Sequence, residues 1–157
     1  MLILVGCVRV QYDNHYFRQK DPGVYRVGST SISVLIMSDS PDAGPFNSKQ
    51  QGPYFIVLKV KTKDRGTAPA LKNLIVQSKE GSELEMEERI ELDPTNYTGE
   101  GMWWTKIIKD SFQPEFYDQQ VISVSITVEV DGENHVVEKD FISKHVKGPE
   151  TVNILTM

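Results

Sequence analysis

The chain has 157 residues, of which 39% are hydrophobic and 25% are charged, and this composition excludes a disordered or collagen-like protein. The length predicts one domain with a core of its own. The 17 basic and 22 acidic residues give a net charge of -5, and no basic stripe reverses that charge locally. Such a surface repels phosphate backbones, so we expect no nucleic acid partner. No stretch reaches the roughly 18 apolar residues of a membrane-spanning helix.

The chain begins with an apolar run that contains its only cysteine, Cys7, so an intramolecular disulfide and a cysteine-rich zinc site are excluded. One interpretation is an ordinary first strand over residues 1–10, in which Cys7 is a small buried hydrophobe. A polar stretch follows over residues 13–23 and ends in a Pro-Gly turn. It is either a tether or part of the first strand, since Tyr16 and Phe17 indicate that some of it packs against the domain.

Alternating apolar and polar residues predict the next strands. Ile32, Val34 and Ile36 alternate with other side chains, as in a strand. Residues 39–53 contain three prolines and two glycines and therefore predict a loop. Residues 54–62 predict a central strand whose aliphatic side chains face the core while its lysines face water.

Two further apolar segments follow in the chain. Residues 71–77 form a short apolar run after a proline. Residues 83–92 alternate glutamates with apolar side chains, and the apolar set is Leu84, Met86, Ile90 and Leu92. Glutamate, leucine and methionine favour helices, but the period of two favours a strand, which we predict here.

The clearest hairpin lies near the C-terminus. Residues 122–130 alternate valine or isoleucine with polar residues. Asp131-Gly132 follows and supplies the positive φ angles of a tight turn, so residues 136–142 are expected to return as the partner strand. The sequence Lys-Gly-Pro at residues 147–149 predicts a break before a last strand over residues 152–155.

Together these segments predict an all-β fold, a β-sandwich of about seven to nine strands with immunoglobulin-like architecture. The Cys-Trp-Cys signature of true immunoglobulin domains is absent, because the chain has one cysteine. We expect residues 24–157 to form this single domain, preceded by residues 8–23 as a tether or first strand.

Seven acidic residues lie between Glu80 and Asp93. Clusters of oxygen ligands bind Ca²⁺, but on a strand these carboxylates form a row, with about 6–7 Å for each step of two residues. The spacing of a calcium loop is also absent. We therefore interpret the stretch as a solvated strand face that resists aggregation, and we expect neither a metal nor a cofactor.

Tyr97, Trp103 and Trp104 are the aromatic residues that could contact a ligand. Exposed tryptophan and tyrosine side chains stack on sugar rings or anchor protein partners. Neighbouring residues of a strand face opposite sides, so a structural interpretation buries one tryptophan and places the other over a sheet edge. Both interpretations stay open at this point.

Catalytic motifs are not found in the sequence. His15, His135 and His145 are far apart, and no spacing places two of them on one face of an element, so we expect isolated histidines. No nucleophile elbow, phosphate loop or dinucleotide fingerprint is present. We therefore expect a non-catalytic protein, with an enzyme of dispersed catalytic residues as a third interpretation.

The segment Leu4-Val5-Gly6-Cys7 resembles the lipobox of bacterial lipoproteins, in which a small residue precedes the cysteine that receives the lipid. The resemblance implies that the mature chain begins at Cys7 and that Cys7 carries acyl groups. Residues 1–7 would then be a truncated signal, because no Lys or Arg precedes the cysteine; a start codon placed too far downstream would produce this pattern. Val8 is not the aspartate of an inner-membrane retention signal, so the resemblance implies outer-membrane sorting in a diderm host.

Two functional hypotheses follow. In the first, the protein is a lipoprotein at the cell envelope, held to the membrane by lipid on Cys7, and its β-sandwich binds a protein or another envelope component. In the second, it is a soluble, cytoplasmic ligand- or carbohydrate-binding domain that uses Trp103 or Trp104, with residues 1–10 as an ordinary strand. An upstream in-frame start that encodes basic and apolar residues would favour the first.

Overall fold

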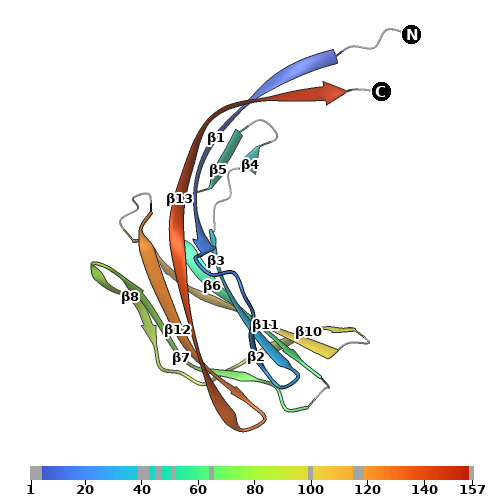
Figure 1. Cartoon of the computed structure of the whole chain (residues 1–157), viewed down its shortest axis with the longest axis vertical. Helices are drawn as coiled ribbons and strands as arrows, with labels where there is room; N and C mark the ends of the chain where they lie inside the picture. The colour runs from blue at the N-terminus through green and yellow to red at the C-terminus, as the bar shows by residue number, and fades with distance from the viewer. Residues whose placement is uncertain are drawn as a thin grey trace.

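The computed structural model describes residues 5–38, 43–44, 47–50, 52–63, 66–98, 101–114 and 119–155. This part of the chain is all-β, without helices, and its two sheets pack together, which confirms the predicted β-sandwich (Figure 1). These residues contain no helix that is long and apolar enough to cross a membrane. The immunoglobulin-like topology stays a prediction.

The two sheets contain eight and five strands, more than the seven to nine predicted, because several strands are too short to stand out in the sequence. In spatial order the larger sheet consists of β4 (Ala43–Gly44), β5 (Asn47–Gln50), β1 (Val5–Gln19), β13 (Glu133–Leu155), β12 (Val121–Val130), β7 (Ala70–Ser78) and β8 (Gly81–Met86), and β9 (Ile90–Glu91) also pairs with β7. The smaller sheet consists of β10 (Asp93–Thr98), β11 (Gly101–Phe112), β6 (Tyr54–Thr62), β3 (Thr30–Ser38) and β2 (Tyr25–Val27).

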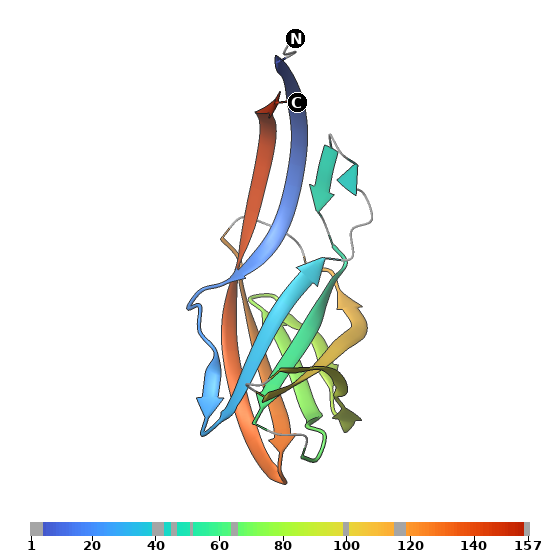
Figure 2. The ribbon, with the colours of Figure 1, turned by 90° about the vertical axis from the view of Figure 1, so that its right-hand side faces the viewer.

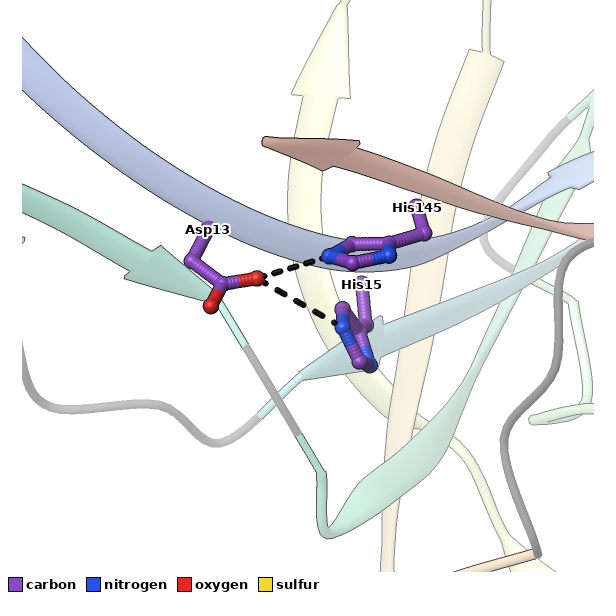
Figure 3. A group of neighbouring side chains, drawn as sticks. All are labelled: Asp13, His15 and His145. Carbon is purple, nitrogen blue, oxygen red and sulfur yellow. Dashed lines mark hydrogen bonds and ion pairs between the residues drawn. The ribbon is translucent and has the colours of Figure 1, made fainter. Parts of the chain in front are cut away.

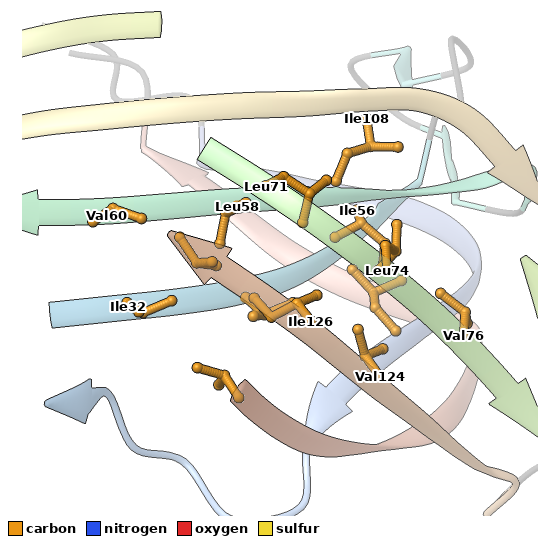
Figure 4. Close-up of a cluster of buried hydrophobic side chains, with 14 of the residues drawn as sticks. Ile32, Ile56, Leu58, Val60, Leu71, Leu74, Val76, Ile108, Val124 and Ile126 are labelled. Atoms are coloured by element: carbon orange, nitrogen blue, oxygen red, sulfur yellow. The ribbon is translucent and has the colours of Figure 1, made fainter. Parts of the chain in front are cut away.

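The core lies between the two sheets and is built by alternation along each strand (Figure 4). On β6, Ile56, Leu58 and Val60 are fully buried, as predicted, while Lys59 and Lys61 are partly exposed. Strand β3 was also predicted, and its alternating Ile32, Val34 and Ile36 are buried in the same core, to which the apolar run of β7 contributes Leu71, Leu74 and Val76. Removal of this apolar surface from water is the main favourable contribution to folding.

The predicted C-terminal hairpin is confirmed. Strands β12 and β13 pair antiparallel from Val130↔Glu133 to Val121↔Ile142. The turn residues Asp131 and Gly132 have φ angles of 52° and 82°. Asp and Gly accept this left-handed conformation more readily than other residues do, which explains why the chain reverses here.

Two sequence predictions need correction. The expected break at residues 147–149 is wrong, because β13 continues through Gly148 and Pro149, which pair with Tyr12 and Gln11. Strand β12 pairs with β13 no further than Ile142, so Pro149 lies on an edge strand, where a missing N–H is tolerated. The predicted loop over residues 39–53 contains the short strands β4 and β5.

The predicted strand over residues 83–92 is confirmed in part. The chain forms β8 up to Met86 and β9 from Ile90, with an interruption between them. Arg89, in the interruption, forms ion pairs with Glu91 and with Glu129 of β12. The apolar side still faces inward along its length, since its members are buried or pack against the core, namely Leu84, Met86, Ile90 and Leu92.

Strands β1 and β13 pair antiparallel from Val5↔Leu155 to Gln19↔Phe141. Beyond the pair Phe17↔Ser143 they leave the sandwich together, and we call residues 5–15 and 145–155 the arm. Figures 1 and 2 show the arm curving away from the two packed sheets, with the start of β1 and the end of β13 at its tip. Strand β5 runs parallel to β1 along residues 11–14 of the arm.

The hairpin register gives a direct stability prediction. Val128 of β12 is fully buried, whereas Val136 of β13 is 55% exposed. Val128→Ala should lower the free energy of unfolding by roughly 2–3 kcal/mol, because it removes buried methyl groups. Val136→Ala, the matched control, should change it by less than about 0.5 kcal/mol. Urea denaturation measures the free energy of unfolding of both variants. An equal loss of stability in the two variants would contradict the register, because a slip of one residue exchanges the two faces of a strand.

Candidate functional site

Three polar side chains meet where the arm joins the sandwich. Asp13 and His15 come from β1, and His145 comes from β13. His15 lies directly opposite His145 in the antiparallel register. Asp13 is two residues from His15, so the pleat of the strand places both on the same face of the sheet. The site therefore depends on the pairing of two segments from opposite ends of the chain.

The side chains converge on one carboxylate oxygen (Figure 3). His145 Nε2 lies 2.8 Å from Asp13 Oδ1, and His15 Nε2 lies 3.6 Å from the same oxygen. The two imidazole rings pack edge to face, with centroids 4.1 Å apart. The side chains keep between 22% and 37% of their surface exposed, so solvent and ions reach them.

The site lies directly beyond the hydrophobic core. Phe17, two residues from His15 on β1, is buried and packs edge to face on Tyr54, with ring centroids 4.8 Å apart. The Tyr54 hydroxyl donates a hydrogen bond of 3.3 Å to the carbonyl oxygen of His15. Burial raises the pKa of Tyr54 to about 12, so this hydroxyl stays a donor. The backbone that presents His15 is thus held by the core.

The charges around the site influence one another. The hydrogen bond from His145 lowers the pKa of Asp13, and the nearby Lys147 ammonium, 3.7 Å from Asp13 Oδ2, acts in the same direction. Partial burial lowers the pKa of His15, and repulsion by a protonated His145 lowers it further, while Asp13 opposes both effects. Burial and the repulsion therefore favour the neutral, electron-donating form of the His15 ring, whereas the Asp13 carboxylate favours the protonated form.

The donor atoms define what the site can do chemically. Two imidazole nitrogens and one carboxylate oxygen are the ligands that borderline divalent metals prefer in proteins. The potential ligand atoms of Asp13, His15 and His145 all lie within 4.8 Å of one another.

The expectation of isolated histidines is wrong for His15 and His145. They are 130 positions apart, and only the β1/β13 register brings them together. The one local signal is the spacing of Asp13 and His15, which share a face if residues 13–15 form a strand. His135 is placed apart from them on β13, opposite Val128.

The structure separates the aromatic residues predicted to contact a ligand. Trp104 is buried, and its Nε1–H donates a hydrogen bond of 3.0 Å to the Thr62 hydroxyl. Trp103 is half-buried, and the Lys61 ammonium lies 5.5 Å from the centre of its ring. This agrees with the structural interpretation of one core tryptophan. Tyr97 lies on the edge strand β10, opposite Met102.

Cys7 lies in β1 opposite Asn153, close to the tip of the arm. Leu4, the first residue of the lipobox-like segment, lies outside the described residues. Val5 and Gly6 belong to β1 and pair with Leu155 and Ile154. The cysteine and the aromatic residues therefore belong to different parts of the molecule, the arm and the smaller sheet.

The acidic stretch gathers no metal-binding group among the described residues. Its carboxylates make separate contacts with nearby side chains. Glu83 accepts a hydrogen bond from Ser78, Glu91 pairs with Arg89, and Asp93 pairs with Lys106 at 3.2 Å. These exposed pairs agree with a solvated face and contribute little to stability.

Comparison of the chain with protein-family models, curated proteins and solved structures finds no match. The interpretation of the site therefore depends on its own geometry and chemistry.

The electrostatics of the site predict how His15 titrates. Its pKa is lowered in the folded state, chiefly by burial, so an NMR titration of the metal-free protein should give a midpoint below the ordinary 6.5. Asp13→Asn should lower the midpoint further, because the carboxylate attracts the proton. The unfolded state binds the proton more readily, so this contribution to stability is complete above pH about 6.5 and is lost as the pH falls through the folded pKa. A midpoint above 6.5, or a rise in the Asp13→Asn variant, would contradict this account.

Proposed function

We propose that the protein is a non-catalytic binding or structural module, held at a bacterial cell envelope by lipid on Cys7, with a protein or another envelope component as its partner. The observation that carries the proposal is the place of Cys7. It belongs to the lipobox-like segment and lies near the tip of the arm, away from the packed sheets.

This place suits a lipid anchor in physical terms. Cleavage before Cys7 would remove only Val5↔Leu155 and Gly6↔Ile154 from the described β1/β13 pairs. Phe17 is the β1 residue that belongs to the core among those whose side chains are described, and cleavage before Cys7 leaves it in place. One acyl chain gives only marginal, reversible membrane binding, so several chains on Cys7 are needed for a stable anchor. The arm would then separate the sandwich from the membrane surface.

The arm also supports a binding or structural role. The backbone of Ser143 bonds to Gln119 and Gln120, and beyond Ser143 no described strand pairs with the outer edge of β13. An open edge offers backbone N–H and C=O groups to an added strand from another chain. An arm of two strands is thus suited to contact with a partner near the surface to which it is anchored.

The second candidate is a soluble, cytoplasmic ligand- or carbohydrate-binding domain. Its support is that residues 5–10 belong to β1 and that Trp103 keeps part of its surface accessible. Since Trp104 is buried, stacking on a ligand would fall to Trp103. In this case Cys7 has no role in anchoring.

Lipid attachment is tested with the native gene and its upstream DNA, expressed in a bacterial host supplied with labelled fatty acid. We expect the protein to incorporate label and to fractionate with the envelope. Cys7→Ser should abolish both, because no other thiol is available for acylation.

Val8→Ser is the matched control and should retain the label, since it changes the next residue and leaves the thiol in place. Incorporation by the Cys7→Ser variant, or none by the native protein, would refute the lipoprotein proposal and favour the soluble domain.

A further inference from the structure

We propose that Asp13, His15 and His145 form a binding site for a divalent transition-metal ion, of which Zn²⁺ is the representative. The site would use the two imidazole Nε2 atoms and one carboxylate oxygen. This inference is independent of lipid attachment, because it concerns the base of the arm rather than its tip.

The spacing of the donor atoms fits a metal of this class. Zinc binds imidazole nitrogen and carboxylate oxygen at about 2.0–2.2 Å, which in a tetrahedral site separates neighbouring ligands by about 3.3 Å. The Asp13 Oδ1 atom lies 2.8 Å from His145 Nε2 and 3.6 Å from His15 Nε2. All three donor atoms lie within 4.8 Å of one another, and rotation of the side chains would bring them to the tetrahedral separations.

The kind and number of ligands select the metal. Ca²⁺ and Mg²⁺ prefer oxygen ligands, and this group offers a single carboxylate. Imidazole suits zinc, copper and nickel. Lys147 competes for the carboxylate from 3.7 Å, but its side chain is 69% exposed and can turn into solvent. The positive charge of Lys147 also disfavours binding of Ca²⁺ and Mg²⁺, which are held mainly by electrostatic attraction.

The ligands also lie on a well-supported scaffold. All three come from paired strands, and the backbone of His15 is held by the Tyr54 hydroxyl. Sites on strands position ligands more accurately than sites on loops. Three protein ligands leave at least one coordination position for water or for a donor from a partner. A bound ion would also join the two ends of the chain at the base of the arm.

The test measures binding of Zn²⁺ and Co²⁺ to the Cys7→Ser protein, in which no thiol can contribute. Isothermal titration should give one Zn²⁺ ion per chain, and Co²⁺ should give the visible absorption of a low-symmetry nitrogen and oxygen site. His145→Ala, His15→Ala and Asp13→Asn should each weaken binding by more than about 100-fold, the upper range for loss of an outer-shell partner. His135→Ala, which changes the histidine outside the site, should leave the affinity unchanged.

Two further readouts separate metal binding from misfolding. At a Zn²⁺ concentration about 100 times the Kd, the melting temperature should rise by about 5–10 °C and return after chelation. Lys147→Ala should tighten binding by about two- to fivefold, because it removes an exposed competing charge. The proposal would be refuted if His135→Ala weakened Zn²⁺ binding as much as the ligand variants do. It would also be refuted if none of the three ligand variants changed the Zn²⁺ affinity. Weaker binding in Lys147→Ala would count against the assigned ligand set.

Discussion

The antiparallel pairing of β1 with β13 holds together both the larger sheet and the candidate site. It joins the two ends of the chain along the register Val5↔Leu155 to Gln19↔Phe141. It places β1 next to β13, which pairs with β12 on its other side, and Phe17 of β1 enters the core. A slip of one residue would turn Phe17 to the outside and separate the polar groups at the base of the arm.

The same alternation that fills the core supplies the candidate site. The inward face of β13 carries Phe141 in the core and, four residues later, His145 in the site, with the buried Ser143 between them. The face becomes polar where the smaller sheet ends, at Ser38 of β3 and Tyr54 of β6. Beyond that point none of the described residues of the smaller sheet covers it, and two histidines and one carboxylate take the place of aliphatic side chains. The change from core to site thus follows from the unequal lengths of the two sheets.

Local patterns predicted much of the sandwich but little of the site. The Asp131-Gly132 turn and the alternation on β6 are local, and both were predicted correctly. Gly148 and Pro149 led to the wrong prediction that the strand ends there. A single sequence does not show that this part of β13 pairs on one side only, where a proline is tolerated. The partnership of His15 and His145 depends on register over 130 positions, which composition and spacing do not encode. Cys7 was found from its neighbours in the sequence, and its function is a proposal.

Disulfide cross-linking between β1 and β13 tests their register in solution. Asn14 and Val146 lie opposite one another, on the face of the sheet away from the site. In the Cys7→Ser protein, Asn14→Cys with Val146→Cys should form a disulfide on mild oxidation, because opposed residues of an antiparallel pair have suitable Cα separations. Asn14→Cys with Ile142→Cys, four residues out of register, should not. Efficient cross-linking of the out-of-register pair, with none of the opposed pair, would contradict the register and with it the candidate site.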